Sequence, residues 1–399
     1  MSTSTTTPAS SRRQMWSAVG SMTLCVAMLI ASEFMPVSLL TPIATDLNSS
    51  QGMAGQAISI SGFFAVLTSL FIAPFAGRFD RRHILLAMTV LMLGSLVLIA
   101  MAPSFIVLMV ARAFLGMAVG GFWSLSTATV LQLVPPNIVP RALGMIYMGN
   151  SLATAFAAPI GAYLGAIIGW RAVFWGLVPL VLLNMLWQLF SLPSMPPKAS
   201  IPVSRVFSLL KRRHVGFGML AIMLQFAGAF TTFTYLRPFL ETETGAGADQ
   251  LSLLLLGLGL AGFAGTWLAG RLLEKNHLLG LLRWLPVIMA SATVGMLAMD
   301  TSVAGVGLMM ILWGAVNAAV PVCWSTWLAK FMSDEPESGG GLMVACIQLS
   351  IMLGGALGGL LLDHISVIAT FAGGTCLLLV SSLIIGGGQR VIHSAATEN

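Results

Sequence analysis

Long apolar runs constrain the fold of this 399-residue chain more than any other feature. A helix needs about 20 mostly apolar residues to cross a bilayer. The sequence contains twelve such runs, at approximately 16–40, 53–77, 84–102, 105–132, 142–165, 172–192, 215–239, 251–270, 278–298, 303–329, 340–362 and 366–388. Only 8% of the residues are charged, compared with roughly a quarter in soluble domains. The sequence therefore predicts an all-α integral membrane protein with twelve transmembrane helices.

The connections between these runs predict how the chain is divided. Residues 1–15 are rich in Ser and Thr and are expected to form a disordered tail. The longest connection, 193–214, is Pro-rich and then basic, so we expect it to link an N-terminal six-helix bundle (16–192) to a C-terminal one (215–388), with a second tail at 389–399. Glycines recur at four-residue spacing in the fifth and the eleventh run. A duplicated six-helix unit is typical of secondary transporters.

The basic residues predict the orientation. The net charge of +6 does not indicate nucleic-acid binding, because the Lys and Arg residues lie in short segments between apolar runs. With the N-terminus in the cytoplasm, sixteen of the 19 basic residues fall on the cytoplasmic side, Arg171 and Arg237 fall outside, and Arg112 lies within a run. The positive-inside rule then places both termini in the cytoplasm.

The sequence lacks the signatures of several classes of protein. No lysine follows a Gly-rich turn in the pattern of a P-loop, and no HExxH or paired Cys/His motif is present. We therefore expect no cofactor, no metal site and no enzymatic activity. A membrane sensor or scaffold that transports nothing is a further alternative, but the loops are too short to supply a signalling domain.

Two charged residues lie within apolar runs. Ionisable groups at bilayer depth are costly and are functional candidates by default. Glu33 and Arg112 lie in the first and fourth runs, and a rise of 1.5 Å per residue puts each roughly 10 Å below the outer end of its helix. We expect Glu33 to carry the coupling proton and Arg112 to be its electrostatic partner. A purely structural ion pair is the alternative.

Amide and aromatic side chains within the runs suit a flat, uncharged solute that forms hydrogen bonds. For any one of them, helix–helix packing is the alternative interpretation. The lack of a second buried acid argues against a pump for divalent cations.

Several motifs resemble those of the major facilitator superfamily, in particular its twelve-helix drug:proton antiporter type. Residues 77–82 resemble the signature between helices 2 and 3, and residues 112–121 resemble the helix 4 motif. Residues 158–161 resemble the helix 5 antiporter motif, although Ala158 stands where that motif has Gly, and residues 164–174 match the block that follows it. The resemblance implies two pseudo-symmetric six-helix bundles in a bacterial inner membrane. It also implies a cytoplasmic latch between them, formed by Asp80, Arg81 and Arg82.

Within this superfamily, residues 33–42, 120–124 and 321–327 resemble purine ribonucleoside efflux proteins. That similarity implies proton-coupled efflux of inosine- and guanosine-like solutes by a monomer in contact with lipid and without nucleic acid. Sugar efflux and multidrug efflux by the same fold are the alternatives. Helices 1, 4, 7 and 10 line the central cavity in this superfamily, which makes substrate-binding candidates of Trp123, Gln225, Tyr235 and Asn317.

Overall fold

The computed structural model describes residues 9–76, 78–135, 138–196, 207–332, 336–386, 388 and 390–391, and no strand occurs among them. The first half of the chain contains α1 (Ala9–Ser38), α2 (Leu40–Asp46), α3 (Gln51–Ala76), α4 (Arg81–Met101), α5 (Phe105–Leu133), α6 (Val139–Ile168) and α7 (Trp170–Ser191). The second half contains η2 (Leu209–Lys211), α9 (Arg213–Thr234), α10 (Leu236–Thr242), α11 (Ala248–Glu274), α12 (Leu278–Ala298), α13 (Val303–Phe331), α14 (Pro336–His364) and α15 (Val367–Ile385).

The predicted all-α membrane fold is confirmed. Within the described ranges, 12 helices are long and apolar enough to cross a membrane. Helix α1 begins at Ala9, so residues 9–15 of the predicted tail are helical. Much of the predicted linker (193–214), the rest of the first tail and most of the second tail lie outside the described residues. The domain boundaries therefore stay predictions.

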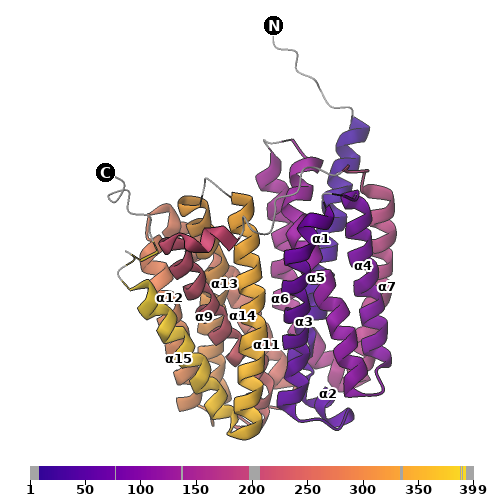
Figure 1. The fold of residues 1–399 in the computed structure, drawn as a ribbon. Helices are drawn as coiled ribbons and strands as arrows, with labels where there is room; N and C mark the ends of the chain where they lie inside the picture. Colours follow the sequence, from indigo (N-terminus) through magenta and orange to yellow (C-terminus); the bar gives the residue numbers. More distant parts are fainter. Residues whose placement is uncertain are drawn as a thin grey trace, which may run out of the picture.

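The two halves pack their helices in the same pattern. In the first half α3 packs on α5, α1 on α6, and α4 on α7. In the second half the equivalent pairs are α11 on α13, α9 on α14, and α12 on α15. Figure 1 shows the first half, indigo to magenta, beside the second half, orange to yellow. The halves meet along two pairs of helices, α3 with α14 and α6 with α11.

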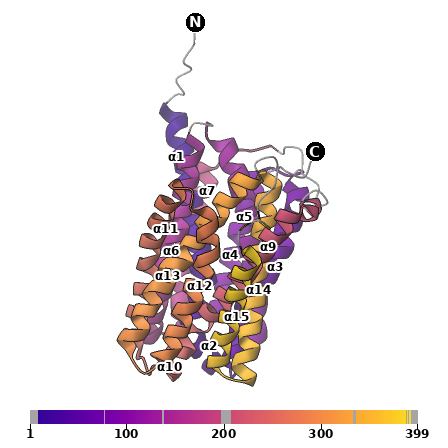
Figure 2. The same cartoon turned by 90° about the vertical axis from the view of Figure 1, so that its left-hand side faces the viewer.

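The molecule has two ends, which we name by the elements found there. The terminal face holds the start of α1 and the end of α15, and the distal face holds the short helices α2 and α10 (Figures 1 and 2). The side-chain hydrogen bonds that join the halves among the residues the structure describes include a group near the distal face. In this conformation the halves are therefore held together at the distal face.

Glycines allow the closest helix contacts within each half. A Cβ atom at Gly116 of α5 would overlap the carbonyl oxygen of Ser61 in α3, and one at Gly265 of α11 would overlap that of Ala315 in α13. Because apolar side chains gain little from one another in lipid, such close backbone contact supplies much of the packing energy. The glycine positions therefore fix the spacing of both helix pairs.

Two predicted spans are interrupted near the distal face. The run at 16–40 is broken at Leu39, between α1 and α2, and the run at 215–239 is broken at Tyr235, between α9 and α10. Proline has no backbone N–H and cannot bond to the carbonyl four residues earlier. Pro42 and Pro238 follow the two breaks and remove helical hydrogen bonds there.

The glycine contact predicts a difference between two substitutions in α11. Gly265→Ala should destabilise the protein by about 1–3 kcal/mol, because its new methyl group must push α11 and α13 apart. A Cβ atom at Gly270 in the same helix would meet no atom within 4 Å, so Gly270→Ala should not destabilise the protein in this way. Thermal unfolding of the two purified variants in detergent checks this. Equal melting temperatures would show that the contact does not determine packing.

Candidate functional site

Arg112 is completely buried in α5 and donates three hydrogen bonds to backbone carbonyls. Its Nε donates to the oxygen of Ala57 in α3 at 2.9 Å. Its Nη1 and Nη2 donate to the oxygens of Ser32 at 2.9 Å and of Glu33 at 3.1 Å, both in α1. The guanidinium group thus joins three helices of the first half around one positive charge.

Proline chemistry explains why α1 can offer an acceptor to Arg112. Pro36 lies inside α1 and has no N–H, so the carbonyl of Ser32, four residues earlier, lacks its helical donor. A carbonyl left without a partner in an apolar environment costs free energy. Arg112 satisfies it, so the proline and the arginine compensate for each other.

The structure brings Glu33 beside Arg112, as the sequence predicts, but with a different geometry. No ion pair within 4.0 Å joins the two side chains among the described residues, because the guanidinium group bonds to the backbone carbonyl of Glu33 instead. The Glu33 side chain is 2% exposed and its Oε1 has no hydrogen-bond partner within the described part of the chain. The carboxyl group is therefore held near a positive charge without being locked to it.

Gln348 of α14 faces Glu33 from the other half of the protein. Its Nε2 is also buried and, among the described residues, without a hydrogen-bond partner. The sequence shows Gln348 as one of several amides within the apolar runs, and it does not indicate that α14 packs against α3. This residue was missed as a site candidate for that reason.

Trp123 and Asn317 are the two predicted substrate-binding residues that keep exposed surface. The Trp123 ring in α5 lies 5.8 Å from the Tyr147 ring in α6, with their planes inclined by 34°. Asn317 lies in α13, four residues and so one helical turn from Trp313. Both residues remain predictions for substrate contact.

Tyr235, another predicted substrate-binding residue, joins helices in this conformation, and its contact with substrate stays a prediction. Its side chain is fully buried beside Gly55 and Gly358 and has no free ring face. Its hydroxyl donates to the carbonyl of Gly355 at 2.8 Å, which joins the end of α9 to α14. The notch left by the glycines fits the ring, so Tyr235 fastens helices near the distal face.

Gln225 is also buried in this conformation, and its contact with substrate stays a prediction. Its side chain is 1% exposed, and its Oε1 accepts a hydrogen bond from Nε1 of Trp324 at 2.8 Å. This bond joins α9 to α13 within the second half. The sequence identified a polar residue on a suitable helix, but it could not show which way the side chain points.

An aromatic cluster that the sequence did not single out includes Phe34, the residue after Glu33. Phe34 of α1 lies 5.5 Å from Phe230 and 6.1 Å from Phe233, both in α9. Phe233 stacks on Trp313 of α13 at 6.1 Å with an interplanar angle of 5°. We refer to Phe34, Phe230, Phe233 and Trp313 as the aromatic cluster. It contains residues from both halves.

The predicted latch residues lie together at the start of α4, within the first half. Asp80 caps this helix by accepting from the backbone N–H of Arg82 at 2.8 Å, and it also accepts from Met195 and from the hydroxyl of Ser194. Burial acts to raise the pKa of Asp80, but these hydrogen bonds outweigh it and hold the pKa below its usual value. Arg82 donates to the carbonyl of Leu189 at 2.6 Å.

The described partners of Asp80 and Arg82 lie in the first half. In this conformation these two residues thus fasten α4 to the end of α7. Arg81 joins them through its backbone N–H, which donates to the carbonyl of Met195. A latch between the halves stays a prediction for a conformation closed at the terminal face.

A second group of polar contacts joins the halves at the distal face, and we call it the distal clasp. Asp363 of α14 accepts from the backbone N–H of Gly52 at 3.0 Å and from the hydroxyl of Ser50, so it caps α3 from the opposite half. On the other side, Arg237 of α10 donates to the carbonyl of Ser38 and pairs with Glu241 at 2.7 Å. Glu241 in turn accepts from Thr41 of α2.

The architecture and the buried charged site define a membrane transporter, and comparison with known proteins supplies the family. The sequence model of the Major Facilitator Superfamily matches residues 22–340. The chain belongs to the Major Facilitator Superfamily, whose members move solutes and are not enzymes.

Two relatives are similar over nearly the whole chain. Transcription regulatory protein OpdE of Pseudomonas aeruginosa is 48% identical over 92% of both chains. Purine ribonucleoside efflux pump NepI of Salmonella enteritidis is 40% identical over 95% of both. Among solved structures, a D-xylose-proton symporter matches with a TM-score of 0.70 at 18% identity, over 93% of this chain and 96% of that one. This last likeness shows the shared fold.

The distal clasp predicts a conformational effect. Asp363→Ala removes the acceptor that the opposite half supplies to the start of α3, a loss of about 1 kcal/mol and roughly a fivefold shift toward separated distal ends. Spin labels at Met53 and Leu360, which are 45% and 56% exposed on α3 and α14, can report the separation. The exposed Cys376 is first replaced by Ser.

Asp300→Ala is the matched control, because Asp300 lies near the same face at the end of α12, outside the clasp. We expect longer distances in the Asp363 variant alone. Unchanged distance distributions in both variants would show that the Asp363 contacts do not hold the halves together.

Proposed function

We propose that this protein exports small neutral solutes in exchange for protons, and that purine ribonucleosides such as inosine and guanosine are its substrates. The observation that carries this proposal is the Glu33 carboxyl, buried at the boundary between the halves with one oxygen unpaired. A carboxyl group in this position can take up and release a proton as the surrounding contacts change. The substrate class is supported by the 40% identical relative, whose name describes purine ribonucleoside efflux.

The proposed cycle is alternating access between the two halves. In the conformation seen here the distal clasp is formed, and the positive-inside rule orients this face away from the cytoplasm. Solute would bind from the cytoplasm and opening of the distal clasp would release it outside. A proton entering from outside would neutralise Glu33 and favour the return. In the opposite conformation, Asp80, Arg81 and Arg82 would close the terminal face.

Arg112 influences the protonation of Glu33 throughout this cycle. Its positive charge favours the ionised form of Glu33, whereas burial favours the protonated form. A small change in exposure of the carboxyl group would therefore alter which form prevails. Sugar efflux and multidrug efflux remain alternatives that use the same proton coupling, because Glu33 and Arg112 do not determine which solute binds.

The more similar relative carries the name of a transcription regulatory protein. A transporter can influence transcription indirectly, when the solute that it removes is one to which a regulator responds. This explanation requires no contact with nucleic acid, and it agrees with a chain in which 12 helices are suited to cross a membrane.

Uptake of labelled inosine into inside-out membrane vesicles tests the proposed function. An acid-inside pH gradient should drive accumulation that is absent without the gradient and absent from vesicles lacking the protein. Labelled arabinose and a panel of cationic drugs are measured in the same vesicles. Accumulation of a sugar or a drug in place of inosine would reject the proposed substrate.

Glu33→Gln separates coupling from binding in these vesicles. The amide keeps the size of the side chain but cannot release a proton, so gradient-driven accumulation should be lost while exchange of internal for external inosine continues. Asp300→Asn, a matched change near the distal face, should behave like the wild type. Gradient-driven accumulation at the wild-type rate in Glu33→Gln would remove Glu33 from the mechanism.

A further inference from the structure

The aromatic cluster is built from both halves of the protein. Phe34 belongs to the first half, whereas Phe230, Phe233 and Trp313 belong to the second. Phe34 meets Phe233 edge to face, at an interplanar angle of 83°. Phe230 and Phe233 also meet edge to face, 5.9 Å apart. Such contacts exchange readily with another aromatic ring of similar size, because every ring presents the same kind of face and edge.

The cluster lies where the closed part of the interface ends. On one side, Phe230 and Phe233 pack against the buried side chains of Val37, Ile58 and Ile351, which fill the interface toward the distal face. The three phenylalanines themselves are only partly buried. They therefore form an apolar surface between the halves, and part of each ring is accessible.

Polar residues neighbour the members of this apolar surface along their helices. The carboxyl of Glu33 belongs to the residue before Phe34, and the amide of Gln348 faces it, each with an atom that lacks a partner among the described residues. Asn317 lies one turn from Trp313 and keeps exposed surface. A buried polar group without a partner costs free energy, so a ligand that supplies donors and acceptors here would be stabilised.

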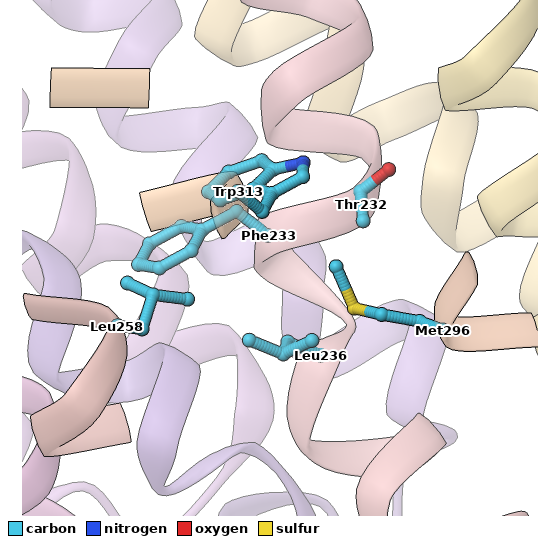
Figure 3. A pocket seen from close by; sticks show the side chains of 6 residues that line it. All are labelled: Thr232, Phe233, Leu236, Leu258, Met296 and Trp313. Carbon is cyan, nitrogen blue, oxygen red and sulfur yellow. The ribbon is translucent and has the colours of Figure 1, made fainter. Parts of the chain in front are cut away.

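Packing behind Phe233 is incomplete. Figure 3 shows Phe233 and Trp313 lying against each other beside a small void that is also lined by Leu236, Leu258 and Met296. Side chains that line a void lack contacts on that side. The Phe233 ring therefore has fewer packing contacts on that side.

From these observations we propose that the aromatic cluster is the binding site for the planar heteroaromatic ring of the solute, with the ring held against Phe34 and Phe230 and its polar edge toward Glu33, Gln348 and Asn317. This inference rests on the proposed export function and names the part of the solute that is recognised. A ring bound there contacts both halves at once. It also lies beside the carboxyl that carries the proton, so solute and proton compete for one small region.

Ligand-induced thermal stabilisation of the purified protein tests this inference without relying on transport. The ligands are inosine, hypoxanthine, which is the planar base alone, and ribose and arabinose, which lack an aromatic ring. Phe34→Leu and Phe230→Leu should each weaken binding of inosine and hypoxanthine about tenfold or more, as expected for loss of a stacking contact. Phe34→Tyr and Phe230→Tyr keep the ring and should restore binding.

Phe63→Leu is the matched control, because this phenylalanine lies on α3, is 43% exposed and packs against Phe64 outside the cluster. It should bind both aromatic ligands like the wild type. Gel filtration shows whether each variant is folded, and a variant that fails this check is replaced by the other cluster position.

The outcomes separate the two proposals. If inosine is transported but both leucine variants bind it as the wild type does, the inference is overturned and the export function stands. If inosine is not exported but the planar ligands bind and the leucine variants weaken them, the inference stands and the substrate assignment falls. Stabilisation by ribose or arabinose alone, or by none of the ligands, overturns the inference.

Discussion

The structure depends on hydrogen bonds from arginine side chains to backbone carbonyls that a proline four residues later has left without a helical donor. Pro36 frees the carbonyl of Ser32, and Arg112 donates to it from α5. Pro42 frees the carbonyl of Ser38 in the same way, and Arg237 donates to it from the opposite half. The first pairing lies within one half and is buried. The second crosses between the halves at the distal face, where it can break as they move.

This difference separates the rigid part of the site from the part that changes. Arg112 joins α1, α3 and α5 whatever the second half does, because all three acceptors belong to the first half. Glu33 instead faces Gln348 of α14, across the boundary. Movement between the halves would therefore alter the surroundings of the carboxyl while its positive neighbour stays in place, which is the condition for coupling a proton to a conformational change.

The sequence predicts the fold and the buried charges well, because both depend on composition along the chain. Twelve apolar runs and two charged residues within them are visible without knowing which helices touch. The roles of Tyr235, Gln348 and Asp363 depend on the contact between α3 and α14, which no local pattern reveals. The same limit explains why Phe34 and Phe230, ordinary apolar residues in an apolar chain, gave no signal.

The central claim is that solute and proton compete at Glu33, and proton release on solute binding tests it most directly. The purified protein is placed in weakly buffered solution near neutral pH with a pH indicator, and the transported solute is added. The account predicts that the wild type releases protons on binding and that Glu33→Gln binds the solute but releases none. Binding without proton release by the wild type, or equal release by both proteins, would contradict it.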